Sequence, residues 1–152
     1  MNEMSDAIAL EIATKAGDAM YDRDHAARAL GIRLEEIRPG FARMSMTVRD
    51  DMVNGHDICH GGFTFTLADT TLAYASNSYN AAAVAQTATI TFTSPGRRGE
   101  VLTAVSEERS HGGRTGIYDV VVTGEDGRAV AHFRGVTQRI KGEVVAGLPV
   151  SQ

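Results

Sequence analysis

The sequence predicts an α+β domain in which an antiparallel sheet of five strands wraps around one long central helix. Three observations support this. One strand-like segment comes first, a mostly apolar helical segment begins near Gly62, and four strand-like segments with short turns follow. Consecutive strands with short connections pair antiparallel, and an apolar helix between them has to be enclosed. The strands are expected at residues 41–48, 84–93, 101–109, 116–123 and 129–140.

The first part of the chain has a loose helical pattern. Residues 5–29 are rich in alanine and charge, although Gly17 weakens the helix prediction and Gly31 should end the helix. We therefore expect a single domain made of an N-terminal helical segment (1–35), a main unit (36–141) and a loose C-terminal tail (142–152).

Bulk properties narrow the functional classes. A chain of 152 residues with 43% hydrophobic content forms one domain with a normal core, and its net charge of −4 argues against nucleic-acid and anionic-membrane partners. The single cysteine, Cys59, excludes an intramolecular disulfide. Neither a signal peptide nor a membrane-spanning run is recognisable. A soluble, cytoplasmic protein is expected.

The most informative segment is residues 54–69, in which a glycine-punctuated loop leads into the helix. Adjacent glycines at a helix start, Gly61 and Gly62, expose backbone N–H groups that can hold a developing oxyanion. Asp69 is a lone carboxylate on a mostly apolar helix, where a charge is costly unless something uses or satisfies it.

Helical periodicity places Asp69 in a narrow polar seam. At 100° per residue the seam spans about 100° of the helix. It consists of Thr66, Asp69, Thr70, Ala73 and Asn77. The seam should face a crevice or a partner, or, in the simpler alternative, solvent.

The spacing of Gly61 and Asp69 adds a constraint. Eight residues of helix separate them by about 12 Å along the axis, too far for an Asp side chain to reach back. If both act on one carbonyl, they must come from different helices. Two antiparallel copies across a two-fold axis would provide this, which predicts a dimer with two composite sites.

Short motifs along the chain resemble those of the hotdog-fold acyl-CoA thioesterases, and more closely the phenylacetate-degradation branch of that family. They are Asn54-Gly55, His60-Gly61-Gly62 and Leu67-Ala68-Asp69, with supporting similarity at residues 73–78, 94–96 and 115–119. The resemblance covers residues 15–141.

The resemblance implies a five-stranded hotdog fold, assembly as a homodimer and often a homotetramer, and hydrolysis of acyl-CoA, aromatic acyl groups being favoured. It places Asp69 at the catalytic carboxylate and Gly61 at the backbone donor. Asn54 and His60 fall on loop positions that shape the site. Where some relatives carry a Ser or Thr to position water, this chain has Ala85, with Thr87 two residues later.

The implied chemistry needs no cofactor, since CoA is part of the substrate. Gly61, with Gly62 beside it, would polarise the thioester carbonyl, and Asp69 would attack directly or deprotonate water; the sequence leaves this choice open. Candidate partners for the CoA phosphates are Arg97, Arg98 and Arg114, although arginines in turns are usually solvated. Candidate acyl-pocket residues, alternatively plain core, are Phe63, Phe65 and Tyr74.

Other residues and motifs bear on alternatives to hydrolysis by this route. His56 and His60 could bind zinc on a helix, but the flanking glycines favour a loop, so no metal site is expected. A G-x-S-x-G elbow is absent, and Cys59 fits a small buried residue better than a nucleophile. A hotdog hydratase or a non-catalytic acyl-CoA-binding dimer stays open, because a fold does not fix a function.

Overall fold

The computed structural model describes residues 2–152. Its helices are α1 (Glu3–Arg23), α2 (His25–Ala29) and α3 (Gly61–Asn77), with a short 3-10 turn at Asp50–Met52. Its strands are β1 (Arg33–Arg38), β2 (Phe41–Thr47), β3 (Ala81–Phe92), β4 (Val101–Gly112), β5 (Thr115–Thr123) and β6 (Ala129–Glu143). Within this range no helix is both long and apolar enough to cross a membrane.

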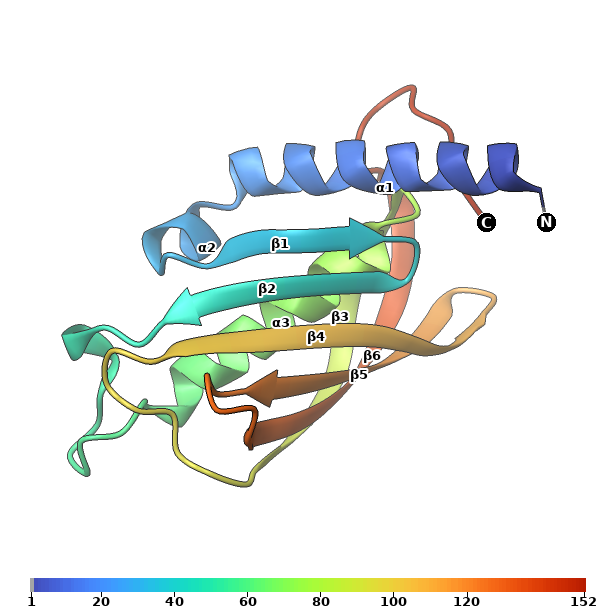
Figure 1. Cartoon of the computed structure of the whole chain (residues 1–152). Coiled ribbons are helices and arrows are strands. Elements are labelled where there is room, and N and C mark those ends of the chain that lie inside the picture. The colour runs from blue at the N-terminus through green and yellow to red at the C-terminus, as the bar shows by residue number, and fades with distance from the viewer. Residues whose placement is uncertain (1) are drawn as a thin grey trace.

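The strands form one antiparallel sheet in the order β1-β2-β4-β5-β6-β3. Figure 1 shows the sheet curving around α3, with α1 lying along β1 and both termini at the same end of the molecule. The predicted α+β hotdog architecture is confirmed.

The sheet has six strands, so the prediction of five was wrong by one. The missed strand is β1, whose sequence RLEEIR mixes charged and apolar residues without a clean alternation. It is an edge strand with an irregular register between Leu34 and Glu36, which blurs the period-two pattern further. It also crosses the expected segment boundary between residues 35 and 36.

Gly17 has a packing role in α1, which continues through it without a break. An added Cβ at Gly17 would lie 2.9 Å from Ile37 Cδ1 and 3.1 Å from Leu34 Cδ2. The glycine therefore lets β1 approach the helix closely, and the predicted helix forms in spite of Gly17 because packing outweighs intrinsic propensity.

The sheet encloses most of α3. Leu67, Leu72 and Tyr74 are fully buried in the core shared with the sheet. The predicted polar seam is the less covered side: Thr66, Asp69, Thr70 and Ala73 are half-buried. The seam's last member, Asn77, is buried and exchanges two hydrogen bonds with the backbone of Ala83, which ties the end of α3 to β3.

β3 forms one edge of the sheet and pairs only with β6. Most of its residues are exposed, including Val84 at 49% and Phe92 at 52%. A long edge strand with exposed apolar side chains is a ready template for pairing with another chain.

The C-terminal residues are tied down, which corrects the expectation of a loose tail. Asn80 Nδ2 donates to Leu148 O at 2.7 Å, and Asn80 Oδ1 accepts from Val145 N–H at 2.8 Å. Ser151 N–H donates to Tyr79 O at 3.0 Å. Residues 142 and 143 continue β6, and the buried Asn80 side chain holds the residues that follow.

Candidate active site

The start of α3 leaves one backbone donor free. His60 is the N-cap residue: its Nδ1 accepts from Gly62 N–H at 3.2 Å, and its carbonyl accepts from Phe63 N–H at 2.9 Å. Within residues 2–152, Gly61 N–H has no acceptor. Of the two glycines, Gly61 therefore presents an unused donor at the positive end of the helix dipole, whereas Gly62 is already bonded.

Asn54 organises the loop before α3. Its Oδ1 accepts from His56 N–H at 2.9 Å and from Ile58 N–H at 3.4 Å, and its own N–H donates to Ile58 O at 2.8 Å. Cys59 N–H donates to Gly96 O at 2.8 Å, which joins this loop to the turn after β3. The loop-shaping role expected of Asn54 therefore has a geometric basis.

A cavity of about 380 Å³ opens beside Gly61. The loop, the helix start and the turn after β3 supply its walls. They comprise Asn54, Ile58, Cys59, Gly61, Thr64, Phe92, Thr93, Ser94, Pro95, Gly96 and Val130. Gly61 N–H is thus an unused donor on a residue that lines an open space.

An ion pair holds one wall of this cavity in place. Arg128 Nη1 and Nη2 donate to the two oxygens of Glu100, each at 2.7 Å, and Nη2 also donates to Pro95 O at 2.6 Å. Only 8% of the Glu100 side chain is exposed. The bonds from Arg128, with help from Arg97 N–H, lower the pKa of Glu100 to about 2.

We expect Glu100→Gln to destabilise the protein by about 1–3 kcal/mol at neutral pH, because Arg128 loses its charged partner. The folded-state pKa is below the ordinary value of 4.5, so the ion pair stabilises fully above pH 4.5 and loses its effect as the pH falls towards 2. Thermal melting at pH 7 and pH 3 measures this. The difference between the two proteins should shrink at pH 3; an equal difference at both values would contradict it.

Asp69 lies two turns into α3 and lacks a partner in its own chain. The carboxylate is half-buried, and burial raises its pKa above the ordinary value of 3.8. No group within residues 2–152 makes a hydrogen bond or salt bridge to it, and Asp69 does not line the cavity at Gly61. An unsatisfied carboxylate on the open side of a helix fits a group that acts on something outside its own chain.

The three candidate arginines are in different environments. Arg98 is paired with Asp50 and Asp57, so its charge is already neutralised. Arg97 is largely exposed, 3.8 Å from Asp126, and its backbone bridges to Ile58 at the cavity end of the molecule.

Arg114 lies at the opposite end of the sheet from Gly61. It is exposed in the turn between β4 and β5, beside His111, whose ring stacks on Tyr79 just beyond the end of α3. Arg97 is therefore the arginine best placed to meet a ligand that enters the cavity of the same chain.

Thr87 lies on the sheet face away from α3. Its partner on β6 is Val136. Ala85, by contrast, pairs with Thr137, which is buried. Ala88 pairs with Gly135, and Gly135 touches Leu72 of α3. Directly paired residues share a face, so a bulge at residue 86 puts Ala85 and Ala88 on the helix side and Thr87 outside. The register therefore places no strand hydroxyl towards Asp69 at either position.

The expected aromatic pocket residues belong to the core. Tyr74 is fully buried and donates to Asp24 at 3.2 Å, and the Phe65 ring packs edge-on against Phe133 at 5.3 Å. The aromatic residue that does line the cavity is Phe92, which the sequence analysis did not single out. The signal that could have found it is its place at the end of a strand, just before the Ser94-Pro95-Gly96 turn.

The surroundings of Cys59, His56 and His60 do not favour a nucleophile or a metal site. Cys59 is 5% exposed, and burial raises the pKa of its thiol, which opposes thiolate formation. His60 is engaged as the helix cap, and His56 is exposed in the loop. In the described part of the chain no three His, Cys, Asp or Glu side chains are grouped to hold a metal ion.

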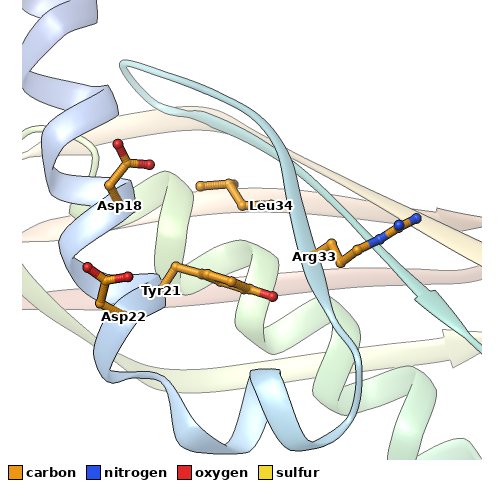
Figure 2. Close-up of a pocket in the computed structure, with 5 residues that line it drawn as sticks. All are labelled: Asp18, Tyr21, Asp22, Arg33 and Leu34. Carbon is orange, nitrogen blue, oxygen red and sulfur yellow. The ribbon is translucent and has the colours of Figure 1, made fainter.

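A larger cavity of about 540 Å³ lies between α1 and β1 (Figure 2). It is lined by Asp18, Tyr21, Asp22, Arg33 and Leu34. Tyr21 O–H donates to Ile32 O at 2.9 Å, and Figure 2 shows the two carboxylates on successive turns of the helix. Its charged lining residues, Asp18, Asp22 and Arg33, are all exposed, and it includes no helix start with a free N–H, so the cavity at Gly61 is the better candidate.

Comparisons with known proteins address the family of the chain. Residues 56–131 match the Thioesterase superfamily. The chain is 48% identical to the acyl-coenzyme A thioesterase PaaI of Escherichia coli over 126 residues, which is 83% of this chain and 90% of the relative. The solved structure of E. coli PaaI, from the phenylacetic acid degradation operon, superposes with a TM-score of 0.87 at 46% identity and covers 88% of this chain and 97% of that chain.

A more distant structure, a hypothetical thioesterase from Streptococcus pneumoniae solved with coenzyme A, has a TM-score of 0.70 at 26% identity. It covers 74% of this chain and 90% of that chain. The family match includes the helix start and all of α3, where the free backbone donor and the unsatisfied carboxylate lie. The chain belongs to the thioesterase superfamily.

Proposed function

We propose that this protein is an acyl-CoA thioesterase that hydrolyses the thioester to a free acid and CoA. The observation that carries the proposal is the unbonded N–H of Gly61 on an open cavity at the start of a long helix. Such a donor is suited to an oxygen that gains negative charge during acyl transfer. The acyl-CoA thioesterase activity named for the E. coli relative and the coenzyme A bound to the streptococcal protein support the substrate class.

The active site would be shared between two subunits. Gly61 and Asp69 are about 12 Å apart along one helix, so one Asp side chain cannot reach a carbonyl held at its own Gly61. The exposed edge of β3 offers a surface for antiparallel pairing of two copies, which would run their α3 helices in opposite directions. We therefore propose a homodimer, and two dimers as a homotetramer.

In this arrangement Gly61 N–H donates to the thioester carbonyl oxygen, which makes the carbon more electrophilic. Asp69 of the partner subunit then removes a proton from water as it attacks, or attacks the carbon itself and is released by water. The C–S bond breaks, and the CoA thiolate leaves and takes up a proton. The half-buried position of Asp69 raises its pKa, so its carboxylate is a stronger base than a fully solvated one.

We further propose that aromatic acyl groups of the phenylacetyl type are preferred and that the protein acts in phenylacetate catabolism in the cytoplasm. The support is the similarity to E. coli PaaI. Arg97, exposed at the cavity end, is the proposed partner for a CoA phosphate; Arg98 and Arg114 are weaker candidates.

The direct test is incubation of the purified protein with phenylacetyl-CoA, followed by mass spectrometry and a thiol-release assay. Free phenylacetate and CoA in equal amounts are expected. A hydrated or dehydrated acyl-CoA would show a hydratase instead. Binding of unchanged phenylacetyl-CoA, with no product from a panel of other acyl-CoAs, would show a non-catalytic binding protein and refute the proposal.

A further inference from the structure

Phe92 is an exposed aromatic residue at a position where exposure is costly. It is the last residue of β3 and leaves 52% of its surface exposed. Its strand partner, Ala131, is fully buried, so the Phe92 ring lies on the helix side of the sheet. The ring is therefore on the side of the sheet where the cavity at Gly61 lies, and it forms part of the lining of that cavity.

The Phe92 ring stands directly against the helix start. A Cβ added to Gly61 would lie 2.9 Å from Phe92 Cζ and 3.2 Å from Cε1, so the tip of the ring is next to the residue with the free N–H. Phe92 is also the one aromatic residue among those that line the 380 Å³ cavity. A carbonyl oxygen bonded to Gly61 N–H would place the attached groups beside this ring.

The remaining walls cannot supply the same contact. The other apolar residues of the lining, Ile58, Pro95 and Val130, have no aromatic ring. Phe65 and Tyr74 are committed to the core, as described above. Among the residues that one chain contributes to the cavity, Phe92 is therefore the one that can favour an aromatic acyl group through ring contact.

We infer that Phe92 is a specificity-determining residue whose ring contacts the acyl group held at Gly61 and favours aryl over linear aliphatic thioesters. This inference rests on the proposed thioesterase function. Contacts between aromatic rings exceed those expected from buried area alone, so the effect should be a several-fold change in relative kcat/KM. Phe92 takes no part in bond making or breaking.

The test compares phenylacetyl-CoA with hexanoyl-CoA in a thiol-release assay on the full-length wild type and three variants. Phe92→Leu keeps an apolar side chain and removes the ring, and it should lower the phenylacetyl-to-hexanoyl ratio of kcat/KM by about 3- to 10-fold. Phe92→Tyr keeps the ring and should preserve the ratio. Leu10→Ala alters an exposed apolar residue on α1, outside the cavity and away from the β3 edge, and should leave the rates with both substrates unchanged.

Each result has a distinct meaning. A ratio that stays constant in Phe92→Leu, whether both rates fall together or neither changes, overturns the inference and leaves the thioesterase function intact. A wild-type protein that cleaves neither of these substrates nor any other acyl-CoA of the panel refutes the proposed function itself. Circular dichroism and melting temperature show whether the variants are folded before rates are compared.

Discussion

Asp69→Asn is expected to lower kcat for thioester cleavage by about 10²- to 10⁴-fold, because an amide cannot take the proton from water or attack the carbonyl. Binding of CoA should be retained, since the proposed role of Asp69 is at the reacting carbonyl or the attacking water and not at the CoA moiety. Steady-state kinetics and calorimetry with CoA measure the two effects separately. A variant with a near-normal rate would remove Asp69 from the mechanism.

The stability of this variant should change in the opposite direction to its activity. Burial raises the folded-state pKa of Asp69 above 3.8, so the ionised carboxylate costs stability as the pH rises through the unfolded-state value. The neutral Asn avoids this cost, and we expect a melting temperature at pH 7 equal to or above that of the wild type. Asp18→Asn, on α1 outside this site, is the matched control and should keep full activity.

The fold was predictable where local pattern and tertiary environment agree. The later strands alternate because one face packs on α3 and the other does not, and their turns carry glycine or proline. β1 was missed because, at an edge, its sequence contains charged residues on both sides of an irregular register. Gly17 weakened the helix prediction because the close contact that requires a glycine there is with Ile37, which lies in another element and is not visible in the local sequence.

The candidate site was predictable in its backbone part and less so in its side chains. A glycine pair ahead of an apolar helix indicates free N–H groups, but the sequence does not show that His60 caps Gly62 and leaves Gly61 free. The opposite faces of Thr87 and Ala85 follow from a bulge that no pattern indicates. Phe92 meets Gly61 only through folding, since the two are distant in sequence and become neighbours when β3 lies beside α3.

The role of the Gly61 N–H can be isolated because proline is tolerated at the first position of a helix. Gly61→Pro removes the N–H and keeps the helix start, and it should lower kcat by about 10²- to 10³-fold. Gly61→Ala introduces the same Cβ contact with the Phe92 ring but keeps the N–H. Because that ring is half exposed and can move aside, the alanine variant should retain much more activity than the proline variant.

Mixing the two inactive proteins then tests whether a site is shared. Suppose that Asp69→Asn and Gly61→Pro chains are co-expressed in equal amounts and pair at random: half of the dimers are mixed, and each mixed dimer has one intact site. Activity should then recover to about a quarter of the wild-type value. If Asp69 and Gly61 served the same site from one chain, every site would contain one of the two substitutions. The mixture would then be as inactive as each variant alone. Recovery from two dead variants requires that the carboxylate and the amide come from different subunits.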